Sequence, residues 1–166
     1  MALEIERKYI IKKTSEELVL SLGASVKKIE QSFLTPSNDF PVRRIRKVTE
    51  EGRESFYFTL KRPANGEFSR EEIEREISTK EYLELQKERD FALNEIFKIR
   101  YVIPFNGLNY EIDKFPFFKE FDVLEIELPS EEFEFTIPPE IEIIKEVTKD
   151  FRFTNFALAK EIPIDF

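Results

Sequence analysis

The fold is decided by the stretch Leu3-Glu4-Ile5-Glu6-Arg7-Lys8-Tyr9-Ile10-Ile11 at the start of the chain. Three charged residues, Glu4, Glu6 and Lys8, recur there at every second position. Successive side chains of a β-strand point to opposite faces, so these three charges would share one face. The pattern therefore predicts a strand with one charged face and one mainly apolar face.

The same two-residue period recurs along the rest of the chain and predicts eight strands in all. The Asn106-Gly107 pair accepts the positive φ angles of a tight hairpin turn, so the two strands that flank it should pair antiparallel. The predicted strands cover residues 3–11, 28–34, 42–48, 55–62, 70–78, 96–103, 108–115 and 123–128.

Helix signals are fewer and lie between the strands. Thr14 with Glu17 has the spacing of a capping box, and Gly23 would end that helix. Ser78 with Glu81 repeats the signal and predicts a helix that reaches about residue 92. Two short helices are expected near residues 141–147 and 155–160. No linker or repeat interrupts residues 1–166, so we expect one α+β domain, mostly antiparallel β.

Composition excludes several classes of function. Lys plus Arg is 26 and Asp plus Glu is 34, and the net charge of −8 disfavours nucleic acid and anionic membranes as partners. The absence of Cys and His excludes disulfides, thiolate metal sites and histidine-based triads, so any metal must be held by oxygen. No apolar stretch approaches the roughly 20 residues that span a bilayer, and the charged N-terminus does not resemble a signal peptide. We therefore expect a cytoplasmic protein.

Charges of opposite sign are segregated between the predicted strands. Arg44 with Arg46 and Lys98 with Arg100 are purely basic pairs, whereas 125–127 and 111–113 carry only acids. The simpler interpretation is a charged face that meets water, but such faces usually mix signs to limit repulsion. If eight strands close into a barrel with these faces inward, the basic walls would suit a polyphosphate and the carboxylates would suit Mg²⁺ or Mn²⁺. Without such a charged ligand and metal, burying these unpaired charges would cost free energy.

The segment Glu4-Ile5-Glu6-Arg7-Lys8 resembles the ExExK signature of the CYTH proteins, also called triphosphate tunnel metalloenzymes. Later segments follow in the order that strengthens this resemblance, which covers almost the whole chain. They are Gln31-Ser32-Phe33-Leu34, Arg44-Ile45-Arg46, Thr59-Leu60-Lys61, Ser69-Arg70 with Glu72 and Glu74, Lys98-Ile99-Arg100-Tyr101, Tyr110-Glu111-Ile112-Asp113, Glu125-Ile126-Glu127-Leu128, and Lys145-Glu146-Val147-Thr148 through Asn155.

The resemblance implies an eight-stranded antiparallel β-barrel, or tunnel, with a few covering helices, which binds a triphosphate and Mg²⁺ or Mn²⁺. Arg152 is a further expected phosphate contact, whereas Lys145 is equally well explained as a surface residue. The main phosphate contacts implied are Lys8, Arg44, Arg46, Lys61, Lys98 and Arg100; the metal ligands implied are Glu4, Glu6, Glu125 and Glu127, supported by Glu72, Glu74 and Asp113. The catalytic group implied by the resemblance is Glu4, Glu6, Lys8, Lys61, Glu125 and Glu127.

The resemblance leaves the substrate open, because one fold hosts several activities. The cyclase branch of the family is associated with a histidine-containing motif, and this chain has no histidine. Thiamine triphosphate hydrolysis is disfavoured by the absence of Trp, although Phe or Tyr could substitute. We therefore expect metal-dependent release of the terminal phosphate from inorganic tripolyphosphate or a nucleoside triphosphate. A noncatalytic protein that binds polyphosphate or an organic phosphate is the alternative, and a homodimer is considered without an identifiable interface.

Overall fold

The computed structural model describes residues 2–166, so the first residue of the expected domain lies outside the described part. All eight strands predicted from the two-residue period are present, each extended or shifted by a few residues. They are β1 (Ala2–Lys12), β2 (Ser25–Phe33), β3 (Val42–Glu50), β4 (Arg53–Pro63), β5 (Ser69–Ile77), β6 (Ile96–Phe105), β7 (Leu108–Lys114) and β8 (Phe121–Glu127).

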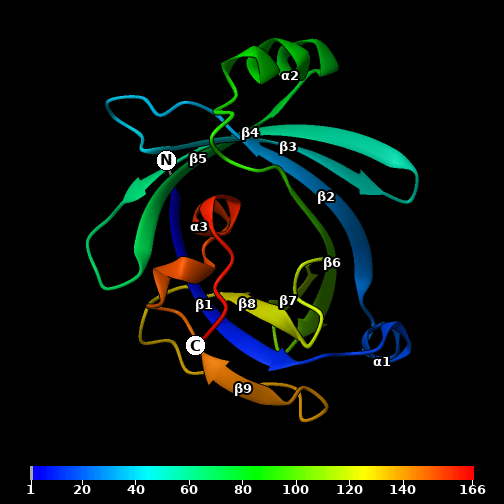
Figure 1. The fold of residues 1–166 in the computed structure, drawn as a ribbon. Helices are drawn as coiled ribbons and strands as arrows, with labels where there is room; N and C mark the ends of the chain where they lie inside the picture. The colour runs from blue at the N-terminus through cyan, green and yellow to red at the C-terminus, as the bar shows by residue number, and fades with distance from the viewer. Residues whose placement is uncertain (1) are drawn as a thin grey trace.

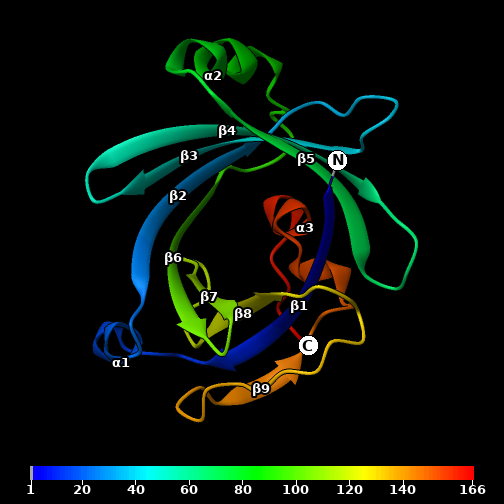
Figure 2. The same cartoon turned by 180° about the vertical axis from the view of Figure 1, so that it is seen from behind.

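These strands form a closed antiparallel barrel in the order β5-β4-β3-β2-β6-β7-β8-β1, with β1 returning to β5. The first part of β1 pairs with β5, from Ala2 opposite Glu72 to Ile5 opposite Ser69. From Glu6 onward β1 pairs with β8. Seen from either end, the strands form a ring (Figures 1 and 2). The predicted eight-stranded barrel is confirmed. Because β1 pairs with both β5 and β8, the sheet closes on itself and has no free edge strand where these pairs form.

The turn between β6 and β7 confirms the antiparallel pairing expected from Asn106-Gly107. Phe105 stands opposite Leu108, and the two turn residues have φ angles of 49° and 77°. Both angles lie in the left-handed region, which Asn and Gly tolerate better than other residues.

The helices agree in part with the sequence. Helix α1 (Glu16–Ser21) is capped by Ser15 and not by Thr14, because the Thr14 amide and hydroxyl donate to Asp122 Oδ2 at 2.8 and 2.9 Å. Ser78 caps α2 (Thr79–Leu85) as expected, but the helix does not reach residue 92. It gives way to the 3₁₀ turn η1 (Gln86–Glu88), and Phe91 is 80% exposed.

The helix expected near residues 141–147 is wrong, because this segment forms strand β9 (Ile143–Glu146). It pairs antiparallel with residues 9–11 of β1, where pairing with β5 has already ended. Two neighbouring β-branched residues, Ile143 and Ile144, favour the extended conformation once an edge is offered. The 3₁₀ turn η2 (Phe151–Phe153) and helix α3 (Asn155–Lys160) follow, and α3 is the short helix expected at 155–160.

The inner face of the barrel changes character along its length. On β1 the side chains that point into the barrel are charged up to Lys8, and the next one is Ile10. Ile10 packs with Phe153 and Leu158 of the C-terminal segment. In both views α3 lies within the ring of strands (Figures 1 and 2). The C-terminal segment therefore packs against an apolar section of the interior and leaves a charged section beside it. Within residues 2–166, none of the helices has both the length and the apolar character needed to span a bilayer.

Candidate functional site

The charged section of the barrel interior is a cavity of about 750 Å³. All eight barrel strands and the C-terminal segment contribute to its lining. Alternation explains this convergence, because every second residue of each strand faces inward. The residues expected from the sequence that line it are Glu4, Glu6, Lys8, Arg44, Arg46, Lys61, Glu72, Glu74, Lys98, Arg100, Glu125 and Glu127.

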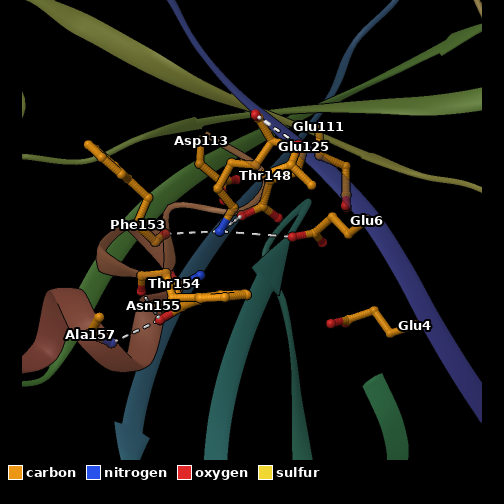
Figure 3. A network of polar contacts seen from close by, with 12 residues as sticks. Glu4, Glu6, Glu111, Asp113, Glu125, Thr148, Phe153, Thr154, Asn155 and Ala157 are labelled. Carbon is orange, nitrogen blue, oxygen red and sulfur yellow. Dashed lines mark hydrogen bonds and ion pairs between the residues drawn. The ribbon is translucent and has the colours of Figure 1, made fainter. Parts of the chain in front are cut away.

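Three carboxylates gather on one wall of the cavity. One oxygen each from Glu6, Glu111 and Glu125 lies within 4.8 Å of the others. They come from the neighbouring strands β1, β7 and β8, and Figure 3 shows them close together, with Glu4 further along β1. Burial, with the nearby carboxylates of Glu125 and Glu4, raises the pKa of Glu6 to about 8, and burial also raises the pKa of Glu111. Such a set of crowded oxygens fits a divalent cation, which would neutralise the repulsion.

Basic side chains flank this acidic group. Lys8 Nζ lies 3.1 Å from Glu125 Oε1 and 3.9 Å from Glu6 Oε1, and Arg100 Nη2 lies 3.0 Å from Glu125 Oε2. Burial alone would raise the pKa of Glu125, but Lys8, Lys98 and Arg100 hold it well below the ordinary value. Lys8 also donates to the carbonyl oxygen of Phe153 at 2.9 Å. Glu125 is therefore ionised and its neighbouring cations are held in place.

Asp113 lies outside the lining of the cavity, in contrast to its expected role as a supporting metal ligand. It is fully buried, and Lys98 Nζ lies 2.7 Å from its Oδ2. Arg100 donates to it through Nε at 2.7 Å and Nη2 at 2.9 Å. Burial and the charge of Arg100 lower the pKa of Lys98 to about 8, although Asp113 opposes this shift. Asp113 thus holds two cations that face the cavity.

The opposite wall presents a buried cation, Arg44, that forms no close ion pair with the described residues. Arg44 is only 7% exposed, and within residues 2–166 neither a hydrogen-bond partner nor an ion pair is found for it. Burial and the neighbouring charge of Arg46 lower the pKa of Arg44 to about 10, although Glu4, Glu74 and Glu72 oppose the shift. Arg46 Nη2 pairs with Glu74 Oε1 at 2.7 Å, while its Nε is buried without a partner. Each of the two guanidinium groups thus has a buried Nε donor without a hydrogen-bond partner, and such donors fit an anion.

A second acidic group lies between the two walls. Lys61 Nζ is 2.9 Å from Glu4 Oε2 and 3.4 Å from Glu72 Oε2. Burial alone would raise the pKa of Glu4, but Lys61 and a hydrogen bond with Glu72 lower it to about 2. Burial and the same hydrogen bond raise the pKa of Glu72 to about 7, and burial and Glu4 raise the pKa of Glu127. Glu4 and Glu72 therefore share a proton near neutral pH.

Two basic residues considered from the sequence lie outside the cavity. The side chain of Arg152 is 51% exposed; it pairs with Asp150 Oδ2 at 2.7 Å and donates to the Asp165 carbonyl oxygen at 3.0 Å. Lys145 is exposed on β9. The structure brings neither side chain to the expected phosphate-binding walls.

Several lining residues were missed by the sequence analysis. Glu111 belongs to the acidic group in which Asp113 was expected, and the two share a strand face. Arg70 continues the inward series of Glu72 on β5, so the same two-residue period could have identified it. Asn155, at the start of α3, accepts from Lys98 Nζ at 3.2 Å. Two further lining cations are Lys27 and Arg53.

Known proteins match this chain over most of its length. The family model of the CYTH domain matches residues 2–150. An inorganic triphosphatase from Acetivibrio thermocellus is 35% identical over 164 residues, which cover 96% of this chain and 95% of that protein. The crystal structure of the inorganic triphosphatase NE1496 has a TM-score of 0.59 at 26% identity, with 98% of each chain covered. The protein PH1819 from Pyrococcus horikoshii, at 22% identity and a TM-score of 0.56 over 78% of this chain and 80% of its own, shares the fold. With its inward-facing charges and its ExExK strand, the chain belongs to the CYTH domain family.

Proposed function

We propose that the chain is a divalent-metal-dependent triphosphatase that releases the terminal phosphate of inorganic tripolyphosphate or a nucleoside triphosphate. The observation that carries the proposal is the guanidinium of Arg44, whose buried Nε has no hydrogen-bond partner and which lines the same cavity as the carboxylates of Glu6, Glu111 and Glu125. A polyanion and a divalent cation are the two ligands that this combination would neutralise together. The 35% identity to an inorganic triphosphatase supports the same reaction.

The basic residues would bind and orient the substrate. Arg44 and Arg46 present planar donors that match phosphate oxygens, and Lys61 adds a compact positive charge beside them. On the other wall Lys98 and Arg100 are positioned by Asp113. Held between two cationic walls, a linear triphosphate would have its charges neutralised and its terminal group fixed in one orientation.

The acidic residues would hold the metal. Glu6, Glu111 and Glu125 form the proposed principal ligand set, and Glu4, Glu127, Glu72 and Glu74 are the other acids of the cavity. When bound, Mg²⁺ or Mn²⁺ would supply Lewis-acid neutralisation of the phosphates and lower the pKa of water. Before binding, Glu6 holds a proton because its pKa is about 8, so the site must release that proton to the solvent or to a neighbouring base.

Phosphate release from tripolyphosphate, ATP and thiamine triphosphate, measured with Mg²⁺, with Mn²⁺ and without metal, tests the proposal. Glu111→Gln should lower metal affinity at least about tenfold, by analogy with the loss of groups around known metal sites. Glu134→Gln is the matched control, because Glu134 is exposed and is not part of the lining. Binding of tripolyphosphate without turnover under any metal would refute hydrolysis and favour a noncatalytic polyphosphate-binding protein.

A further inference from the structure

The carboxylate of Glu131, in the connection between β8 and β9, forms hydrogen bonds with the loop before β5. Its Oε2 accepts from the Phe68 amide at 2.9 Å and from the Ser69 hydroxyl at 2.7 Å, and its Oε1 accepts from the Glu67 amide at 3.1 Å. These hydrogen bonds lower the pKa of Glu131 to about 2, so the carboxylate is ionised throughout the neutral range. One side chain thus satisfies three donors of the segment that leads into β5.

The backbone of this loop is adapted to the carboxylate. Gly66 has a φ angle of +114°, which other residues rarely adopt. A Cβ atom at Gly66 would lie 2.6 Å from Glu131 Oε2 and 3.1 Å from Ser69 Oγ. The contact therefore requires glycine for two reasons, the backbone conformation and the close approach of the carboxylate.

The contact spans the place where the barrel closes. Ser69 stands opposite Ile5 of β1, and the amide of Leu128, just after β8, donates to the Ile5 carbonyl oxygen at 2.7 Å. Pairing of β1 passes from β5 to β8 at the next residue, Glu6. Glu131 therefore joins the segments on both sides of β1 at the point where β1 changes its partner.

The inner face of the barrel at this closure point, where β1 meets β5, carries residues of the proposed site. Glu4 stands opposite Arg70, and both line the cavity. Glu4 in turn contacts Lys61, which stands opposite Glu72 in the pairing of β4 and β5. A displacement of the start of β5 would move these side chains together, because they belong to three adjacent strands.

We propose that Glu131 is a positioning residue of the CYTH cavity. By tying the start of β5 to the connection after β8, it fixes the distance between Glu4, Lys61 and Glu72 without touching the substrate. The inference rests on the proposed function, because it assigns this group a part in binding the triphosphate and its metal. The Glu131 carboxylate would act by holding β5 in place where the barrel closes, and not by contacting a ligand in the cavity.

Hydrogen exchange tests the structural part. In Glu131→Gln the neutral amide loses the charge-assisted bonds and turns an NH₂ group toward one of the donors, so the amides of 67–70 should exchange about tenfold faster. Amides of β6 and β7 should exchange as in the wild type. Glu132→Gln is the matched control, because this neighbouring glutamate is exposed and forms no side-chain hydrogen bond or ion pair with the described residues. Unchanged exchange at 67–70 in Glu131→Gln would overturn the proposal.

Binding and kinetics test the functional part. Glu131→Gln should raise the KM for tripolyphosphate and the half-saturating metal concentration about tenfold, and excess metal should restore part of the activity. Glu131→Asp, which keeps the charge, should have KM and metal requirement between those of the wild type and Glu131→Gln. Gly66→Ala should change both in the same direction as Glu131→Gln. Faster exchange with unchanged KM and metal dependence would refute the positioning role. If the wild type hydrolyses nothing, the proposed function fails, and tripolyphosphate affinity by calorimetry then decides on Glu131.

Discussion

Asp113→Asn would remove one negative charge from behind the phosphate-facing wall while nearly preserving the shape of the side chain. Asp113 is fully buried, and its two oxygens lie 2.7 Å from Lys98 Nζ and 2.7 Å from Arg100 Nε. The side chain of Lys98 is itself only 1% exposed. The variant would therefore leave a buried ammonium without its closest counter-charge.

The expected loss of stability follows from this geometry. Removing one partner of a buried ion pair costs about 3–5 kcal/mol. Glu125 still faces Lys98 electrostatically and Asn155 still accepts from it, so we expect about 3 kcal/mol. At about 2–4 °C for each kcal/mol in a chain of this size, the melting temperature should fall by about 6–12 °C.

The same substitution should weaken phosphate binding through Lys98. Its pKa is already lowered to about 8, with Asp113 among the groups that oppose the shift. Without Asp113 the pKa of Lys98 should fall further, so the amine would be largely neutral near pH 7. Loss of one charge-assisted phosphate contact should lower tripolyphosphate affinity about tenfold.

Thermal unfolding and calorimetric titration with tripolyphosphate measure both effects. Asp122→Asn is the matched control, because Asp122 is equally buried and pairs with Lys114 at 2.6 Å outside the cavity lining. It should lower the melting temperature without changing affinity. Adding Lys98→Met to Asp113→Asn should recover part of the lost stability. The reasoning is refuted if Asp113→Asn binds tripolyphosphate as tightly as Asp122→Asn does.

Two further predictions concern the charges that line the cavity. Arg44→Met should stabilise the ligand-free protein by about 1 kcal/mol, since burial and Arg46 disfavour the Arg44 charge more than Glu4, Glu74 and Glu72 favour it. It should also weaken tripolyphosphate binding about tenfold. The Arg43→Met control should keep its affinity, because Arg43 pairs with Glu88 outside the lining; denaturant unfolding and calorimetry measure the two effects. Mg²⁺ affinity should rise about tenfold per pH unit up to about pH 8 and then level off, because Glu6 must lose its proton to bind; a flat titration curve would contradict this. The stability of the metal-free protein should change in the opposite direction with pH. The folded protein keeps the Glu6 proton up to about pH 8, whereas the unfolded chain loses it near pH 4.5. The contribution of Glu6 to stability should therefore decrease as the pH rises from about 4.5 to about 8.

The barrel could be predicted from the sequence because the decisive signal is local. Alternation of charged and apolar residues, as in Glu4, Glu6 and Lys8, defines a strand and its two faces without reference to the rest of the chain. The segment 143–146 carries too few alternating residues for the same inference. Its strand forms because β1 has a free edge there, which depends on where β5 ends in three dimensions.

The candidate site shows the corresponding limit. A two-residue period says which face a side chain occupies, and it places Glu111 and Asp113 together; it does not say how far along the barrel axis each one lies. Asp113 lies behind Lys98 and Arg100, next to the section of the interior that Phe115 and the C-terminal segment fill. Glu111, one step nearer the cavity, meets carboxylates from two other strands instead. The position along the barrel axis thus decides whether an inward carboxylate is a proposed metal ligand, as Glu111 is, or pairs with Lys98, as Asp113 does. That position matters because the C-terminal segment covers one section of the interior and leaves the other as the cavity.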